Sequence, residues 1–281
     1  MKPLHFALFL AVALALSGCG SMLSPRTEKQ NASVVDYLYP DAKDPPRMQA
    51  EVTRLKLPVK VGIAFVPSAA GWGANAQLSE TEKLRLLERV KTAFARHDYI
   101  GKIEIVPTTY LRAKGGFANL EQVARMFDVE VMALVSYDQV QFNDNNNLSL
   151  LYWTIVGMYL VQGDRYDVQT LMDASVFDVA SRKLLFRAPG TSRVKGSATV
   201  SGFTEQSRAA RVKGYEEATG EMIPALQAQL DAFKDRVKGD ASVKVETRPE
   251  YRGGGALGAG EALLACVGLG VWAWRTRRRR S

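Results

Sequence analysis

The chain has 281 residues, with 37 lysines and arginines against 29 acids and a formal net charge of +8. Lys2 and residues 256–281 carry five of these charges, so residues 19–255 keep only +3 and nucleic-acid binding has no support. The two cysteines, Cys19 and Cys266, lie near opposite ends of the chain. We therefore expect neither a disulfide nor a cysteine metal site.

The chain begins as an export signal, residues 1–18. Lys2 precedes an apolar run over residues 4–16, which is too short to span a bilayer. Leu-Ser-Gly-Cys at 16–19 resembles the bacterial lipobox. This resemblance implies that signal peptidase II cuts between Gly18 and Cys19 and that acylation enzymes attach lipid to Cys19. Because no Asp follows Cys19 directly, the pattern resembles that of lipoproteins sent to the outer membrane; an ordinary secretory signal or an uncleaved anchor is the alternative.

Residues 19–57 follow as a predicted tether. They are rich in Pro, Asp, Lys and Arg, and Pro40, Pro45 and Pro46 interrupt any regular element. We expect this segment to be mostly unstructured.

Residues 58–240 are predicted to form one envelope domain. The apolar run 59–66 indicates a buried strand, and Ser79 and Glu82 resemble a capping box that opens an amphipathic helix. A strand at 103–106, a helix at 120–127 and a strand over the first half of 129–142 complete a β-α-β-α-β order.

The second part of this domain favours an antiparallel hairpin followed by a helix. Residues 169–179 and 183–194 alternate apolar and polar positions around a short turn, and residues 203–237 are predicted to be helical, with a possible kink at Pro224. The predicted fold class is α/β, a single sandwich domain with a mixed sheet. The order is similar to the small α/β domain at the amino end of TolB, and such domains generally bind proteins.

Between the strand and the hairpin, residues 148–161 form a nearly uninterrupted apolar run that is too short for a bilayer span. The run has two interpretations. It packs over the sheet as part of the core, or it exposes a contact surface for a protein partner or a membrane. The residues of that surface would be Tyr152, Trp153, Met158 and Tyr159.

The chain ends in a linker, residues 241–255, an apolar stretch, residues 256–274, and an arginine cluster, residues 275–281. The stretch is interrupted by Glu261 and is long enough for one transmembrane helix, while the arginines indicate a cytoplasmic end. The linker contains three adjacent glycines, which cannot hold a stable helix at the membrane edge. The residues concerned are Gly253, Gly254 and Gly255, and Arg275, Arg277, Arg278, Arg279 and Arg280.

This order of glycines, span and arginines resembles the GlyGly-CTERM tail that rhombosortases recognise. With the lipobox, it makes the chain resemble the family called rhombotarget lipoproteins. The resemblance implies that a rhombosortase cuts near residues 253–255 and removes the span, so that the domain stays on its lipid in the outer membrane or at the cell surface, while an uncut tail stays in the inner membrane. An ordinary C-terminal anchor with a glycine hinge is the alternative.

The sequence offers no recognised catalytic residues, and we expect no cofactor and no metal. His5 is lost with the signal, and His97 is expected to face solvent at a helix end. The glycines at 71–75 and 115–117 are interpreted as loops, the run 143–147 as a polar turn, and Glu216 with Glu217 as a solvated helix face.

We therefore expect a non-enzymatic envelope lipoprotein that binds an unknown envelope protein and membrane lipid, and that is itself a rhombosortase substrate. Two alternatives stay open: a spacer that keeps both its lipid and its transmembrane helix, and an envelope hydrolase with an unrecognised site.

Overall fold

A six-stranded mixed sheet is the centre of the structure. The computed structural model describes residues 26–40, 52–68, 78–145, 164–199, 202–240 and 242–249. Within them the strand order is β4-β3-β5-β6-β7, and β1 also pairs with β5. The strands are β1 (Arg26–Ala32), β3 (Val59–Phe65), β4 (Ile100–Ile105), β5 (Val131–Asn145), β6 (Asp164–Asp178) and β7 (Leu184–Ala198). A two-stranded parallel sheet joins β2 (Thr53–Leu57) to β8 (Val243–Thr247).

Strand β5 divides the sheet into two halves. Its first residues, 131–135, pair in parallel with β3, and residues 137–143 pair in antiparallel with β1. We call the part with β3 and β4 the proximal half and the part with β1 the distal half. Strands β5, β6 and β7 are antiparallel and run through both halves, with Tyr137 opposite Met172 and Met172 opposite Gly190 at the division.

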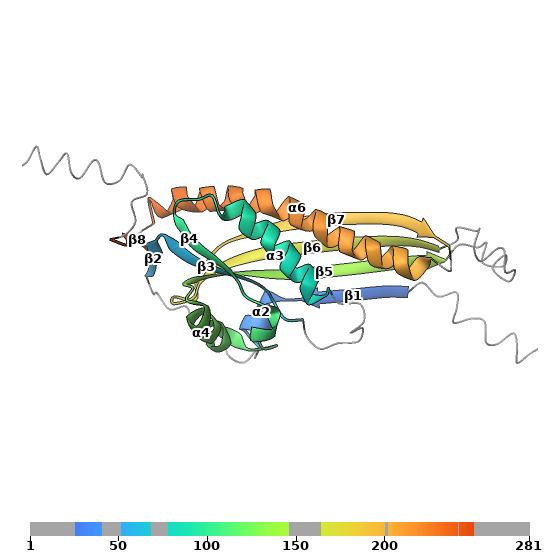
Figure 1. Ribbon diagram of the computed structural model, residues 1–281, viewed down its shortest axis with the longest axis horizontal. Coiled ribbons are helices and arrows are strands. Elements are labelled where there is room, and N and C mark those ends of the chain that lie inside the picture. The colour runs from blue at the N-terminus through green and yellow to red at the C-terminus, as the bar shows by residue number, and fades with distance from the viewer. Residues whose placement is uncertain are drawn as a thin grey trace, which may run out of the picture.

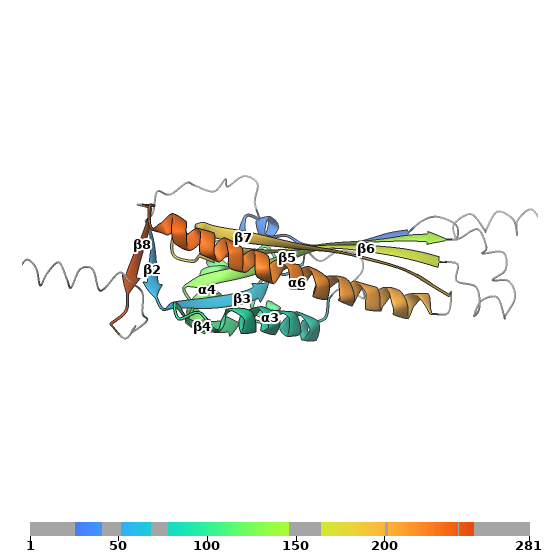
Figure 2. The same cartoon turned by 90° about the horizontal axis from the view of Figure 1, so that it is seen from above.

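Helices cover the two faces of the sheet unequally. Helices α3 (Glu80–Phe94) and α6 (Phe203–Val237) lie on one face, which we call the helix face. On the other face, α2 (Val34–Leu38) and α4 (Gly116–Phe127) lie beside the proximal half (Figure 1). Figure 2 shows that α6 runs along the whole length of the sheet. The distal half therefore has a described helix on one face only.

Local sequence signals explain where the helices begin and end. Ser79 caps α3, because its hydroxyl accepts a hydrogen bond from the Glu82 amide at 3.2 Å. Helix α4 ends at Asp128, which takes the left-handed conformation with φ 53°. Helix α6 continues through Pro224, which is exposed to solvent.

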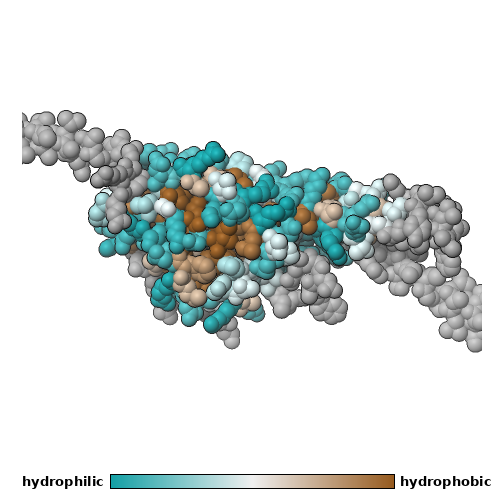
Figure 3. Space-filling view, in the orientation of Figure 1, coloured by the Kyte–Doolittle hydropathy of each residue, from teal (hydrophilic) through white to brown (hydrophobic). Residues whose placement is uncertain are grey.

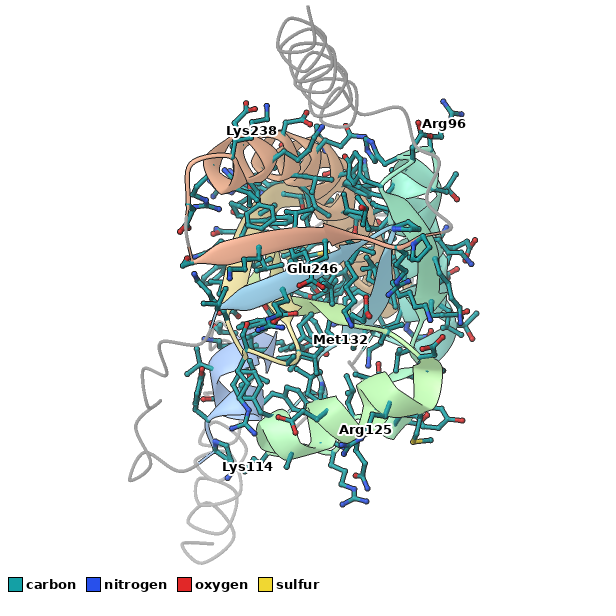
Figure 4. The ribbon with its side chains drawn as sticks, turned by 90° about the vertical axis from the view of Figure 1, so that its left-hand side faces the viewer. Arg96, Lys114, Arg125, Met132, Lys238 and Glu246 are labelled. Atoms are coloured by element: carbon teal, nitrogen blue, oxygen red, sulfur yellow. The ribbon has the colours of Figure 1, made fainter. Side chains whose placement is uncertain are left out.

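The proximal half contains the apolar core. Alternate residues of β5 point to opposite faces, so Ala133 faces α3 and α6 while Met132 and Leu134 face α4. Met132 and Leu134 are fully buried. Figure 4, seen from the β2–β8 end, shows α6 and α3 on one side and α4 on the other, with Arg125 of α4 pointing away from the sheet. Figure 3 shows apolar residues gathered on the surface of the proximal half.

The distal half replaces this core with a buried polar layer beneath α6. Gln139 donates through Nε2 to the Thr170 hydroxyl at 2.8 Å and to the Arg211 carbonyl at 3.0 Å. The Ser192 hydroxyl donates to the Gly214 carbonyl at 2.7 Å. Gln139 is only 1% exposed. Here hydrogen bonds join α6 to the strands in addition to apolar contacts, such as the ring contact of Tyr166 with Phe203 at 6.2 Å.

The predicted α/β fold with a mixed sheet is confirmed, as are the hairpin, now β6 and β7, and the helix over 203–237. The polar turn predicted at 143–147 is wrong for residues 143–145, because β5 extends to Asn145 and pairs there with Asp164. The strand is longer than predicted because its polar second half is buried under α6.

Two predicted boundaries are wrong. The tether over 19–57 contains β1, α2 and β2, and the linker over 241–255 contains β8. The fold therefore extends beyond residues 58–240, from Arg26 to Thr247. Strand β1 has no apolar pattern; it forms because its backbone pairs with β5. Strands β2 and β8 form because the backbone of each pairs in parallel with the backbone of the other.

Within the described residues, no helix combines the length and the apolar character needed to cross a membrane. The predicted span over 256–274 lies outside the described residues.

Candidate functional site

The candidate site lies on the face of the sheet opposite α6, where α2 meets the strands. Helix α2 is held there by two buried side chains, Tyr37 and Leu38. The Tyr37 hydroxyl donates to Asn119 Oδ1 at 3.0 Å, and the amide of Arg112 donates to the same oxygen at 2.8 Å. Burial raises the pKa of Tyr37, so its hydroxyl stays protonated. These contacts fix α2 against α4 and make it a rigid wall.

A groove of about 510 Å³ opens between this wall and the sheet. Its apolar side chains include Val35, Leu171 and Leu184, which are 64%, 44% and 44% exposed. They come from α2, β6 and β7, respectively. Exposed apolar side chains grouped in a concave surface are typical of binding sites rather than of an inert surface.

Two carboxylates line the groove beside these apolar residues. Asp173 accepts from Arg187 Nε at 3.1 Å on one oxygen and from the Ser175 hydroxyl at 3.0 Å on the other. Asp138 Oδ2 lies 3.3 Å from Lys29 Nζ. Asp138 Oδ1 is buried and has no hydrogen-bond partner among the described residues. The other carboxylate oxygen, Oδ2, is therefore the one that the ion pair with Lys29 uses.

The open face, defined here as the distal side of the sheet away from α6, continues this surface along the strands. Arg193 makes a two-point contact with Asp167, with Nε–Oδ1 at 3.0 Å and Nη2–Oδ2 at 2.6 Å. The Arg193 guanidinium, with Lys195 beside it, lowers the pKa of Asp167. Phe142 lies opposite Asp167 and is 41% exposed. The open face thus alternates ion pairs with single apolar side chains.

This arrangement can bind a surface, but it brings together no recognised set of reacting groups. Within the described parts of the chain, no three His, Cys, Asp or Glu side chains are grouped as a metal site would require. The carboxylate of Asp178 accepts from the amide and the hydroxyl of Ser181, which closes the β6–β7 turn. The chemistry available at the groove is hydrogen bonding, ion pairing and apolar contact.

The predicted site residues lie mainly outside the described residues. These are Gly18, Cys19, the contact residues Tyr152, Trp153, Met158 and Tyr159, the glycines at 253–255 and the arginines at 275–280, together with the loop at 71–75. None of them is placed relative to the groove.

Other predicted positions are described. His97 was expected to face solvent, but it is half-buried, with its ring 5.1 Å from that of Tyr99. Gly115 precedes α4 as its N-cap, whereas Gly116 is the first residue of α4 rather than part of a loop; Gly116 takes φ 64°, which favours glycine. Glu216 forms an ion pair with Arg85 of α3, and so it joins two helices instead of only facing solvent.

Sequence reasoning missed the groove because its residues come from the assumed tether and from both strands of the hairpin. Leu171 carried a signal, since it occupies a position that the alternation of β6 assigns to the polar face. Val35 could not have been identified from the sequence, because nothing in it indicated that α2 would contact the sheet.

Solved structures similar to this chain include two structures of PelC dodecamers from Paraburkholderia phytofirmans. A single-substitution variant in space group C2 gives a TM-score of 0.24, and a form in space group P6 gives 0.22. Each is 12% identical, and the similarity covers 69% of this chain and 99% of that chain. No family model matches the chain, and no curated protein matches it either. At these TM-scores the similarity carries no weight for function, which is inferred below from this chain's own residues.

Proposed function

We propose that the protein is an exported bacterial envelope lipoprotein, without enzymatic activity, that binds another protein through the groove and the open face. The observation that carries the binding role is the groove itself, where Val35, Leu171 and Leu184 are exposed beside the carboxylates of Asp138 and Asp173. Protein interfaces have this composition, with apolar side chains at the centre and charged pairs around them.

The position of β1 supports the lipid anchor as a means of holding this surface near a membrane. Residues 20–25 separate Cys19 from Arg26, where β1 begins. An extended chain of this length spans no more than about 25 Å. A lipid on Cys19 would therefore keep the distal end of the sheet close to the membrane, and the open face would lie beside it.

The C-terminal tail follows β8, which lies at the end of the fold away from the start of β1. Strand β8 pairs with β2 at the end of the molecule opposite to the start of β1 (Figure 2). Helix α6 has 35 residues, and at 1.5 Å per residue it spans about 50 Å between these ends. The predicted lipid and the predicted span would thus leave the fold from opposite ends. Removal of the span by a rhombosortase would leave the protein upright on its lipid.

The same geometry gives a specific form to the spacer alternative. If both anchors are kept, the protein either lies flat on one membrane or bridges two surfaces about 50 Å apart, as the length of α6 sets. The two functions predict different C-termini. The spacer still ends at Ser281, whereas the processed lipoprotein has lost this residue with its span.

Intact-mass and terminal-peptide analysis of the protein from envelopes of its native host measures this fact. The proposal predicts acyl mass on Cys19 and a new C-terminus near residues 253–255. Replacing Gly253, Gly254 and Gly255 with leucines should preserve the tail. An acylated wild-type chain that still ends at Ser281 would establish the spacer, and a lipid-free chain would contradict both.

Site-specific photocrosslinking tests the binding surface. A benzophenone amino acid at Leu171 should give a discrete crosslinked product in host envelopes, and a second change, Leu184→Asp, should abolish it. Leu84 is the matched control, because it is an exposed leucine, 40% accessible, on α3 and away from the groove. Equal products from Leu171 and Leu84 would contradict the assignment of the groove.

A further inference from the structure

Strand β7 forms one border of the sheet (Figure 1), and no other described strand pairs with its outer edge. The amide of Thr191 shows which backbone groups point outward, because it donates to Glu221 Oε2 of α6 at 3.1 Å. In a strand, the N–H and C=O groups of successive residues point to opposite edges. The outward groups of β7 therefore belong to its odd-numbered residues from Arg187 onward, and those of the even-numbered residues pair with β6.

The proximal part of this edge is closed by other groups of the chain. Arg236 Nη2 donates to the Leu185 carbonyl at 2.9 Å. Pro189 has no N–H group to donate. Glu221 accepts from both the amide and the hydroxyl of Thr191 at 3.1 Å. Proteins protect exposed strand edges by such means, so this part of β7 is blocked for a further strand.

The distal part of the edge, at Arg193 and Lys195, lacks this cover among the described residues. Both residues are exposed, and both side chains point to the open face, where they contact Asp167. No described residue forms a hydrogen bond with their outward backbone groups. A row of such backbone groups is a template for pairing with another strand.

The charges beside this edge define which strand fits. Arg193 and Lys195 share one carboxylate, that of Asp167, at 2.6 Å and 3.8 Å, so one positive charge remains unmatched. Side chains directly opposite each other on neighbouring strands attract when their charges are opposite and repel when they are alike. Antiparallel pairing with β7 of a second copy would place Arg193 opposite Lys195. The edge therefore disfavours a second copy through β7 and favours an acidic strand.

We propose that the β7 edge at Arg193 and Lys195 binds an extended segment of another protein as an added strand, with acidic side chains at alternate positions opposite the two cations. Backbone hydrogen bonds supply the affinity, and the acidic side chains set the register. This inference rests on the proposed protein binding, for which it names the chemistry of the partner. Because the groove includes Leu184 and Arg187 of the same strand, one partner can contact the groove and the edge together.

Amide hydrogen exchange at residue resolution tests the site. The purified full chain in amphipol is studied with and without a short synthetic peptide that alternates glutamate with valine. In the free protein the amides of Arg193 and Lys195 should exchange much faster than that of Val194, which pairs with β6. At about ten times its Kd, the peptide should slow both amides about tenfold. The amide of Thr191 should not change, because Glu221 already accepts from it.

Charge reversal tests the acidic character of the partner. Lys195→Glu should weaken binding of this peptide by about fivefold or more and strengthen binding of the same peptide with lysine in place of glutamate, as fluorescence anisotropy measures. Lys102→Glu is the matched control, because Lys102 also forms an ion pair but lies on β4 at the opposite border of the sheet. Thermal unfolding shows that both variants fold.

Three outcomes would overturn the proposal. They are a peptide that protects no β7 amide, equal affinities for Lys195→Glu and Lys102→Glu, and protection of the edge that rises with protein concentration without peptide, which would place a second copy there. The crosslink from Leu171 in host envelopes tests the proposed function separately. If the crosslink forms but no peptide protects β7, the partner uses the groove without the edge. If both fail, protein binding itself is contradicted.

Discussion

The two halves of the sheet share three long strands and one long helix, yet they are built differently. In the proximal half both faces are covered, and apolar side chains such as Leu134 and Leu120 are fully buried. In the distal half α6 covers one face through a buried layer of amides and hydroxyls, and the opposite face carries exposed ion pairs.

The difference indicates that the two halves have different roles. Apolar burial is the main source of free energy in folding, so the proximal half supplies most of the stability. The distal half keeps its polar layer only because almost every buried group there finds a partner. Its other face carries no described helix and forms the open face. The following predictions test this comparison, beginning with the largest effect.

The same truncation on the same face should lower the free energy of unfolding much more in the proximal half than in the distal half. Leu134→Ala removes a side chain with no exposed surface from beneath α4 and should lower the free energy of unfolding by about 2–5 kcal/mol. Leu171→Ala acts on the open face and should change it by less than about 1 kcal/mol. Urea denaturation of both variants measures the difference, and equal losses would mean that the distal face is covered in solution.

The contact between α6 and β7 at the division of the sheet leaves no space for a side chain. A Cβ at Gly190 would lie 2.2 Å from the Ala218 carbonyl oxygen and 2.6 Å from the Met222 amide nitrogen. Gly190→Ala should therefore push α6 from the sheet and lower the free energy of unfolding by about 3 kcal/mol.

Gly220→Ala is the control for this variant. Gly220 lies inside α6, and the nearest atom to an added Cβ is Arg89 Nη2 at an ordinary 3.7 Å. An alanine in a helix interior should stabilise the protein by about 0.5–1 kcal/mol. Thermal unfolding distinguishes the two, and a Gly190→Ala variant as stable as the wild type would contradict the close packing of α6.

The buried polar layer should depend on the two hydrogen bonds that Gln139 donates. Gln139→Ala leaves the Arg211 carbonyl and the Thr170 hydroxyl oxygen without the donor that each has in the wild type, and should cost about 1–3 kcal/mol of unfolding free energy. Gln169→Ala, on the open face of the neighbouring strand, should change it by less than about 0.5 kcal/mol. If hydrogen exchange of the β5 amides were equally slow in both variants, the layer would not hold α6 in place.

The smallest effect concerns the ion pair between Asp167 and Arg193. Because Arg193 lowers the native pKa of Asp167 below its ordinary 3.8, the pair stabilises the fold above that pH. The contribution is lost as the pH falls through the lowered native pKa. Exposed pairs contribute at most about 1 kcal/mol, so Asp167→Asn should be slightly less stable than the wild type at pH 7 and equal to it at low pH. Urea midpoints at both pH values measure this, and a constant difference would assign the effect to packing.

Much of the fold was predictable from local patterns. The alternation in β6 and β7 and the turn between them identified the hairpin, and the apolar spacing with the Ser79 cap identified α3. The site was not predictable in this way. Val35 comes from a segment without apolar periodicity, and Asp138 and Leu171 become neighbours only through the pairing of β5 with β6.

The sequence by itself determined the α/β class and the order of the elements in residues 58–240, because periodicity and short capping motifs are local properties. Only the tertiary structure decided that residues 26–38 belong to the fold, that the second half of β5 buries amides, and that one face stays open. These depend on which strand edges and faces meet, and that pairing is a property of residues far apart in the chain.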